Sequence, residues 1–198
     1  MNPILNKNNY FVKEHTGIFK AANQYDIFDL ETKESLIECR EPNLGFFTKM
    51  FRFTKYKAMT PFDVIMSQTG SGARVLSVKR PVTWFRSVVT VHDENDVQVG
   101  TLRKIFKFFK ATFEILDINN NKIGTLEGDF TGWDFKLKDN DGNVLATVTK
   151  KWAGIGKELF TTADNYACNF SESVKQDDPI RIMMMATVIC IDMVLKER

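Results

Sequence analysis

Histidine is the side chain most often used for acid–base catalysis near neutral pH, and this chain has only two. Neither His15 nor His92 has a cysteine, serine or carboxylate at a spacing that a known catalytic motif requires. His92 stands beside Asp93 in a predicted turn, where a solvated polar side chain is the expected role. The histidines therefore indicate neither a nucleophile–base pair nor a proton relay.

Two patterns that could bind a nucleotide or a metal are incomplete. The stretches "GSGAR", from Gly70, and "GIGKE", from Gly154, lack residues that a dinucleotide fingerprint or a phosphate-binding loop requires, so we interpret both as turns. Cys39, Cys168 and Cys190 lie far apart and form no CxxC pair, which argues against a His/Cys metal site and for a reducing compartment. We predict that the protein is not an enzyme and has no resident cofactor.

Cations and aromatic residues are interleaved in two stretches, "GFFTKMFRFTKYK" (45–57) and "LRKIFKFFK" (102–110). Such a mixture suits an anionic lipid surface, near which each Lys or Arg contributes about 1 kcal/mol. The candidate lipid-binding cations are Lys49, Arg52, Lys55, Lys57, Arg103, Lys104, Lys107 and Lys110, and the candidate membrane-contacting aromatics, expected at exposed hairpin tips, are Phe46, Phe47, Phe108 and Phe109. The alternative is that these aromatics belong to the core beneath a solvated cationic face.

The formal charge of +2 is unevenly distributed along the chain. Residues 45–110 contain twelve Lys or Arg against four Asp or Glu, a net charge of +8, and the rest of the chain carries −6. In a meandering barrel this division predicts a basic sector beside an acidic one. A basic sector also fits an acidic protein or a nucleic acid, so a scaffold that binds either partner is the second functional hypothesis.

The elements that must position these side chains are predicted to be β-hairpins. Segments 25–41, 88–104, 113–128 and 135–152 each alternate apolar and polar residues on both sides of a polar turn that opens with an Asp, a residue that can bond the backbone two positions on. Segment 62–81 has the same pattern around a Gly-Ser-Gly turn. With further strands near 10–13 and 165–170, the sequence predicts about twelve strands in an antiparallel sheet.

One helix is predicted after the strands, from Pro179 to about Leu195, with Asp178 as its N-cap. Its apolar run has 14 residues and reaches only about 21 Å, whereas the hydrocarbon of a bilayer is about 30 Å thick. A helix that is apolar on every side is buried on every side, so we predict that it threads the barrel. The predicted buried residues are Ile182, Met183, Met184, Met185, Val188, Ile189 and Ile191.

The segment "VTKKWAGIGKELFTTADNYACNF" followed by an apolar helix containing "CID" resembles the phospholipid scramblase and LURP-one-related family. The hairpins, "VLSVKRP", "VGTLRK" and "IGTLEG" occur in that family's order. The resemblance implies a tubby-like fold, in which a closed barrel of twelve strands surrounds a hydrophobic C-terminal helix. It covers most of the chain, so we expect a single domain over residues 1–198.

The resemblance also implies contact with phospholipids, since scramblases are associated with calcium-dependent lipid movement and tubby proteins with phosphoinositide binding. The scramblase calcium segment corresponds here to residues 160–164, where Thr162 replaces the first acidic residue. The remaining oxygen ligands do not have EF-hand spacing, so calcium is only a weak candidate cofactor. The candidate calcium ligands are Asp164, Asn165, Asn169 and Glu172.

Taken together, these features predict a non-enzymatic, membrane-peripheral phospholipid-binding protein. Residues 1–15 have no apolar segment of the signal-peptide type, so we expect a cytoplasmic monomer that binds the inner face of a membrane. Lipid scrambling is the further activity that the resemblance suggests, although a barrel filled by its own helix offers no evident path for a headgroup. The alternative remains a soluble scaffold whose basic face binds nucleic acid or an acidic protein.

Overall fold

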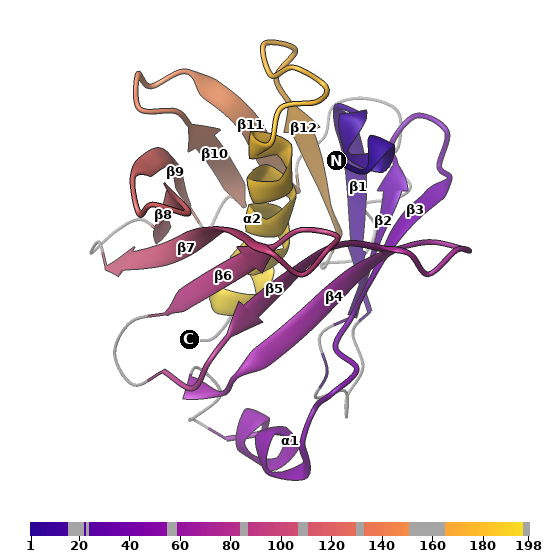
Figure 1. The fold of residues 1–198 in the computed structure, drawn as a ribbon, viewed down its shortest axis with the longest axis vertical. Coiled ribbons are helices and arrows are strands. Elements are labelled where there is room, and N and C mark those ends of the chain that lie inside the picture. The colour runs from indigo at the N-terminus through magenta and orange to yellow at the C-terminus, as the bar shows by residue number, and fades with distance from the viewer. Residues whose placement is uncertain are drawn as a thin grey trace.

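The computed structural model describes residues 1–15, 22, 24–54, 59–83, 87–106, 111–129, 133–150 and 165–195. Within these residues twelve antiparallel strands close into a barrel around one helix (Figure 1). Each strand pairs with the next in sequence, and β12 pairs with β1, where Asn9 lies opposite Asn169 and Lys13 opposite Asn165. The closed barrel with its C-terminal helix confirms the predicted fold.

The strands follow one another along the chain with few interruptions. They are β1 (Asn9–Glu14), β2 (Gln24–Asp29), β3 (Ser35–Arg40), β4 (Phe62–Gln68), β5 (Arg74–Arg80), β6 (Val88–His92), β7 (Gln98–Phe106), β8 (Ala111–Asp117), β9 (Lys122–Asp129), β10 (Asp134–Lys138), β11 (Val144–Thr149) and β12 (Asn165–Phe170). In β4 the alternation of side chains is plain, since Phe62, Val64 and Met66 are buried and the residues between them are partly exposed. This period of two directs one side of each strand to the interior.

Three hairpin turns have the same hydrogen bonds around an Asp. In each turn one Asp Oδ1 accepts from the backbone N–H groups two and four residues later, at 2.8 to 3.0 Å. The three aspartates are Asp93, Asp117 and Asp139. Three residues after each of them the backbone has positive φ, at Asp96, Asn120 and Gly142. The repeated sequence pattern is therefore a repeated turn, in which short polar residues or glycine tolerate the left-handed conformation.

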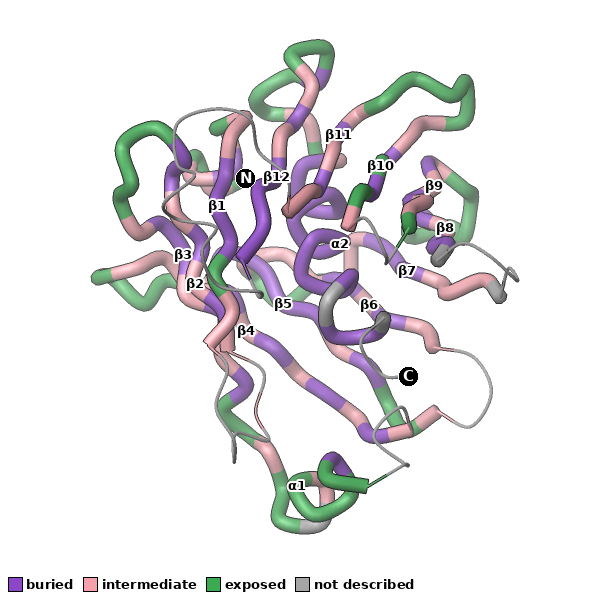
Figure 2. The backbone as a smooth tube through the Cα atoms, turned by 180° about the vertical axis from the view of Figure 1, so that it is seen from behind, coloured by how far each residue is buried: buried purple, intermediate pink, exposed green. Residues whose placement is uncertain are grey.

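The helix α2 (Ile180–Leu195) runs through the barrel interior (Figures 1 and 2). Asp178 Oδ1 accepts from Ile180 N at 2.9 Å, close to the predicted helix start. Every residue predicted to be buried, from Ile182 to Ile191, is at most 6% exposed. No helix of the described residues is long and apolar enough to cross a membrane.

A buried arginine fixes the beginning of α2 to the barrel. The Arg181 guanidinium donates to the carbonyl oxygens of four residues, Leu5, Lys7, Val174 and Lys175, and to Asn8 Oδ1, at 2.7 to 3.0 Å. These bonds use all five donors that an arginine has. Arg181 is fully buried, and its network joins α2 to the 3-10 helix η1 (Pro3–Asn6) and to the start of β1.

The alternating strand directions give the barrel two distinct ends. The turn end contains the start of α2 and the connections β2–β3, β4–β5, β6–β7, β8–β9 and β10–β11. The opposite end, which we call the α1 end, contains the last turn of α2 and the β3–β4 connection with the short helix α1 (Phe46–Arg52). The sequence predicted an exposed hairpin tip at Phe46 and Phe47, whereas the structure has this helix.

Candidate functional site

The helix α1 exposes large apolar side chains on the outside of the molecule. Phe46 is 75% exposed, Met50 50%, Phe51 44% and Phe53, the residue after the helix, 62%. Figures 1 and 2 show α1 at the bottom of both views, beyond the barrel strands and largely exposed. Single exposed apolar residues are common, but four within eight positions form a patch of the kind that is typical of interaction surfaces.

The two faces of α1 have different roles. Phe46, Met50 and Phe53 are spaced four and three residues apart, so they share the outward face of the helix. Thr48 and Arg52, also four residues apart, are the less exposed among the helix positions whose side chains the structure describes. Lys49 lies next to the apolar face and is exposed.

A buried ion pair fixes this orientation. Arg52 Nη1 donates to Glu41 Oε2 at 2.5 Å, and Arg52 Nη2 donates to Glu41 Oε1 at 2.6 Å and to the Pro61 carbonyl at 2.8 Å. The planar fork of arginine matches both carboxylate oxygens, so the pair fixes direction as well as distance. Because Glu41 follows β3 and Pro61 precedes β4, Arg52 joins α1 to both flanking strands and turns its apolar face away from the barrel.

A pocket of about 390 Å³ lies where α1 approaches the ends of β4 and β5. Its lining includes Thr48 of α1, Phe62 and Asp63 of β4, and Lys79 and Pro81. Asp63 lies opposite Lys79 in the β4–β5 register. The pocket therefore lies on the less exposed side of α1 and has apolar walls and the acceptor Asp63, while the Lys79 ammonium is paired with Asp96.

The structure divides the predicted lipid-binding residues into several environments. Phe46 and Lys49 are exposed on α1, as a membrane-contacting role requires. Arg103 lies on the barrel wall, where its Nη1 is 3.8 Å from Glu114 Oε2. Lys55, Lys57, Lys107, Lys110, Phe108 and Phe109 lie outside the described residues, as does the Phe47 side chain.

Two of the predicted cations have internal partners. Arg52 is buried in its pair with Glu41, so it orients α1 and is not a lipid contact. Lys104 lies on the same side of β7 as the buried Leu102. Its Nζ donates to the carbonyl of Val194, in the last turn of α2, at 3.1 Å. A cation suits the negative end of a helix dipole, so Lys104 stabilises the helix end.

The calcium candidates that the structure describes are not brought together. Asn165 begins β12 and Asn169 is four residues further along the same strand, about 13 Å away for an extended chain. Asn169 Nδ2 donates to Asn9 Oδ1 across the closure of the barrel. Glu172 is exposed in the following turn, and Asp164 lies outside the described residues. The three described candidates therefore do not form one coordination shell.

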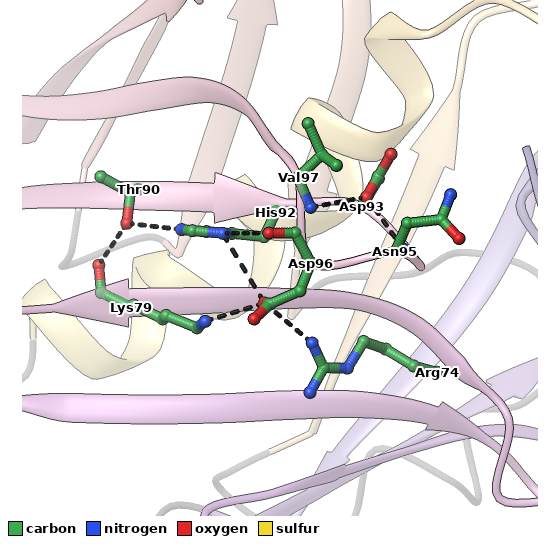
Figure 3. A network of polar contacts seen from close by, with 8 residues as sticks. All are labelled: Arg74, Lys79, Thr90, His92, Asp93, Asn95, Asp96 and Val97. Carbon is green, nitrogen blue, oxygen red and sulfur yellow. Dashed lines mark hydrogen bonds and ion pairs between the residues drawn. The ribbon is translucent and has the colours of Figure 1, made fainter.

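Two of the three cations of β5, Arg74 and Lys79, share one acid of the β6–β7 turn (Figure 3). Asp96 Oδ1 is 2.8 Å from both Lys79 Nζ and Arg74 Nη1. The hydrogen bond from Lys79 lowers the pKa of the Asp96 carboxyl. His92, predicted to be a solvated turn residue, is within 3.2 Å of the Asp96 carbonyl oxygen and 3.1 Å of Thr90 Oγ1. In this part of the predicted basic sector, one carboxylate of the turn therefore compensates part of the charge of two cations.

Among the described residues no three His, Cys, Asp or Glu are grouped as metal ligands. Cys39, Cys168 and Cys190 are all buried, and burial raises the pKa of the Cys39 and Cys168 thiols. Buried thiols with raised pKa values are poor nucleophiles. Among the described residues, α1 is therefore the candidate functional site.

Sequence reasoning missed three of the four residues in the exposed patch, namely Met50, Phe51 and Phe53, together with Glu41 as the partner of Arg52. A signal for the patch was present, because positions 46, 50 and 53 have helical spacing. The sequence contained no signal for the ion pair of Arg52 and Glu41, because the two residues are eleven positions apart in a connection without periodicity.

The fold and the site define a closed β-barrel protein with an internal apolar helix and an exposed amphipathic helix at one end. The family profile described as Scramblase matches residues 6–198, so the chain belongs to the Scramblase family. The resemblance noted from the sequence is thereby confirmed.

Individual relatives are distant. The chain is 23% identical over 176 residues to Altered inheritance rate of mitochondria protein 25 of Saccharomyces cerevisiae, covering 77% of this chain and 53% of that protein. It is 22% identical over 111 residues to a phospholipid scramblase family protein of Schizosaccharomyces pombe, covering 52% of this chain and 29% of that protein. The chain thus spans about half the length of the first relative and less of the second.

A solved structure shares the fold. An X-ray structure of a protein from Arabidopsis thaliana superposes with a TM-score of 0.57 at 12% identity, covering 95% of this chain and 92% of that one. At this identity the likeness concerns the fold alone.

Proposed function

We propose that this scramblase-related protein is a peripheral phospholipid-binding module that attaches to membrane surfaces containing anionic lipids. The observation that carries the proposal is the exposed face of α1, where Phe46, Met50 and Phe53 stand beside Lys49. Phenylalanine and methionine leave water on entering the boundary between headgroups and acyl chains, and lysine remains with the anionic headgroups.

The magnitudes favour a reversible attachment. Complete burial of a large apolar side chain contributes about 1.5–3 kcal/mol, and a cation near an anionic surface about 1 kcal/mol. Because the four apolar residues are only partly exposed, they and Lys49 together supply about 4–8 kcal/mol, which corresponds to binding weaker than micromolar, since micromolar affinity requires about 8 kcal/mol. Buried Arg52 keeps the apolar face directed outward, which lowers the cost of ordering this short helix on the membrane.

Movement of lipids between leaflets is a further proposal that family membership suggests. The interior that a headgroup would have to cross is filled by α2, whose central residues Met184, Met185 and Ala186 are fully buried. Scrambling by this chain would require α2 to leave or strands to separate, and either event would expose a large apolar surface to water. Surface binding requires no such change.

The test is co-sedimentation with vesicles of phosphatidylcholine alone and of phosphatidylcholine mixed with phosphatidylserine, at low and raised salt and with and without calcium. We expect sedimentation with the mixed vesicles that weakens with salt. The double variant Phe46→Ser/Phe53→Ser should lose most of this binding. Ile118→Ser is the matched control, because Ile118 is 56% exposed at the turn end.

Absence of the wild-type protein from the anionic vesicle pellet at low salt would contradict the proposal. A salt-sensitive shift of mixed-sequence DNA would favour the alternative scaffold instead. The exposed phenylalanines favour the lipid proposal, since phosphate backbones are bound mainly by cations and polar groups.

A further inference from the structure

The turn end of the barrel is acidic. It comprises residues 1–8, 30–34, 69–73, 93–97, 118–121, 139–143 and 171–179, all of which the structure describes. By sequence these segments contain three cations and ten acids, a net charge of −7, and no aromatic residue. Their acids are Glu31, Glu34, Asp93, Glu94, Asp96, Asp139, Asp141, Glu172, Asp177 and Asp178.

The strands and α2 together are neutral by sequence, with eleven cations and eleven acids. On the outer wall some of these opposite charges are paired with each other, for example Arg40 with Asp26 and Arg103 with Glu114. Since the whole chain is +2, the remaining residues carry +9 by sequence, of which the connections that alternate with those of the turn end contribute +8 and residues 196–198 contribute +1. Among the described residues, the turn end therefore carries −7, whereas the connections of the α1 end carry Lys49, Arg52 and Lys150 against Glu41. This division runs from end to end, whereas the sequence predicted two sectors around the wall.

Aromatic residues are separated in the same way. Of the 24 aromatic residues, ten belong to strands and none to the segments of the turn end. Among the described residues, the exposed large aromatics Phe46, Phe51 and Phe53 all lie there, and Val82 of the β5–β6 connection is 59% exposed at the same end. The exposed large apolar residues of the turn end, which include Met1, Val97 and Ile118, are not aromatic.

From this separation, and resting on the proposed function, we propose that the barrel binds an anionic membrane end-on. The α1 end faces the bilayer, with α1 and Val82 at the lipid surface, and the acidic turn end points away from it. The helix α2 then lies along the membrane normal, with its C-terminus nearest the lipid.

The distances involved favour this orientation over side-on binding. The sixteen residues of α2 separate the two ends by about 24 Å, more than twice the Debye length of about 8–10 Å at physiological salt. In the end-on orientation the −7 charge of the turn end is therefore screened from the anionic lipid. Side-on binding would bring part of that negative charge within one Debye length of the anionic lipid. The barrel wall that would then contact the lipid has no net positive charge to compensate for it.

The experiment attaches the environment-sensitive fluorophore NBD to single introduced cysteines. The native cysteines are all buried, so a surface cysteine is the accessible one in the folded protein. Phe53→Cys and Met50→Cys report on α1, Ile118→Cys on the turn end, and Lys136→Cys, in the middle of β10, on the wall. Each is titrated with vesicles of phosphatidylcholine and phosphatidylserine, and sedimentation of the labelled protein is measured in parallel.

We expect a several-fold gain in NBD emission with a blue shift at positions 50 and 53, and little change at 118 and 136. A gain at 136 that equals the gain on α1 would overturn the inference in favour of side-on binding. A gain at 118 without one on α1 would overturn it in favour of the turn end. Sedimentation without a change at 50 or 53 also contradicts the orientation but leaves the proposed function intact, whereas failure of the wild-type protein to sediment contradicts the proposed function itself.

Discussion

Arg52 of α1 and Glu41 at the end of β3 are joined by two hydrogen bonds, of 2.5 and 2.6 Å, at a place where neither side chain is more than 4% exposed. Breaking a buried pair by removing one partner costs about 3–5 kcal/mol, because the other charge stays buried and unpaired. Since α1 lies outside the barrel core, this loss can be relieved by detachment of α1 without unfolding of the barrel.

We therefore expect Arg52→Met and Glu41→Gln each to accelerate hydrogen exchange at the amides of α1 and to weaken vesicle binding. Barrel amides, such as those of β8 and β9, should exchange as in the wild type. The double variant should be less impaired than the sum of the two singles, because it leaves no unpaired charge. Strictly additive effects, or exchange at α1 that does not change, would show that the pair does not hold the helix.

Met184 lies at the centre of α2 and is fully buried. Met184→Asp places a carboxylate in the barrel interior, where desolvation costs several kcal/mol, a large part of the 5–15 kcal/mol that stabilises a typical domain. We expect the variant to be insoluble or to lack near-UV circular dichroism, whereas Met184→Leu, which conserves volume, should fold. A soluble Met184→Asp protein with an unchanged thermal midpoint would contradict burial of α2.

The two ends of α2 are held by contacts of unequal strength. Arg181→Met leaves four carbonyl oxygens and Asn8 Oδ1 without their donor, and we expect a loss of about 3–5 kcal/mol in the free energy of unfolding. Lys104→Met removes one bond, to the Val194 carbonyl, and should cost about 1 kcal/mol. Urea unfolding measures both, and equal losses would be inconsistent with Arg181 as the main attachment.

The barrel and its helix were predictable because their signals are local and repeated. Alternation of apolar residues defines the strands, the Asp turns recur at Asp93, Asp117 and Asp139, and the apolar run from Ile182 has no alternative to burial once a barrel surrounds it. The inward position of Lys104 was also predictable, because it is two residues after Leu102 in β7 and therefore lies on the same face of the strand.

The site was less accessible to sequence reasoning for two physical reasons. The environment of Arg52 depends on Glu41, a partner in the same connection that no periodic pattern indicates. The charge of a meandering barrel alternates between its ends with each connection, so a sum over the continuous stretch 45–110 mixes both ends. Summing alternate connections together with the chain ends separates −7 from +9 by sequence.

Asp29, at the end of β2, predicts how stability depends on pH. It is 5% exposed, and its carboxylate accepts from Glu31 N at 2.8 Å and Thr32 N at 3.0 Å and pairs with Lys7 Nζ at 2.5 Å. Burial raises the pKa of the Asp29 carboxyl, but the bonds from Lys7 and the two amides outweigh it, so that the pKa is lowered from 3.8.

A lowered pKa in the folded state means that the contribution of Asp29 to stability is fully present above the unfolded pKa of about 3.9 and is lost as the pH falls through the folded value. Asp29→Asn keeps an acceptor for the turn but loses the charge opposite Lys7. Because Lys7 is 43% exposed, we expect a loss of only about 1 kcal/mol at pH 7.

The difference between Asp29→Asn and the wild type should persist from pH 7 to pH 5 and shrink below about pH 4, as measured by urea unfolding at each pH. Asp141→Asn, at an exposed position of the β10–β11 turn, is the control that separates this effect from a general change in net charge. A difference that grows as the pH falls would mean that the Asp29 carboxyl is stabilised in its protonated form, contrary to the pairing with Lys7.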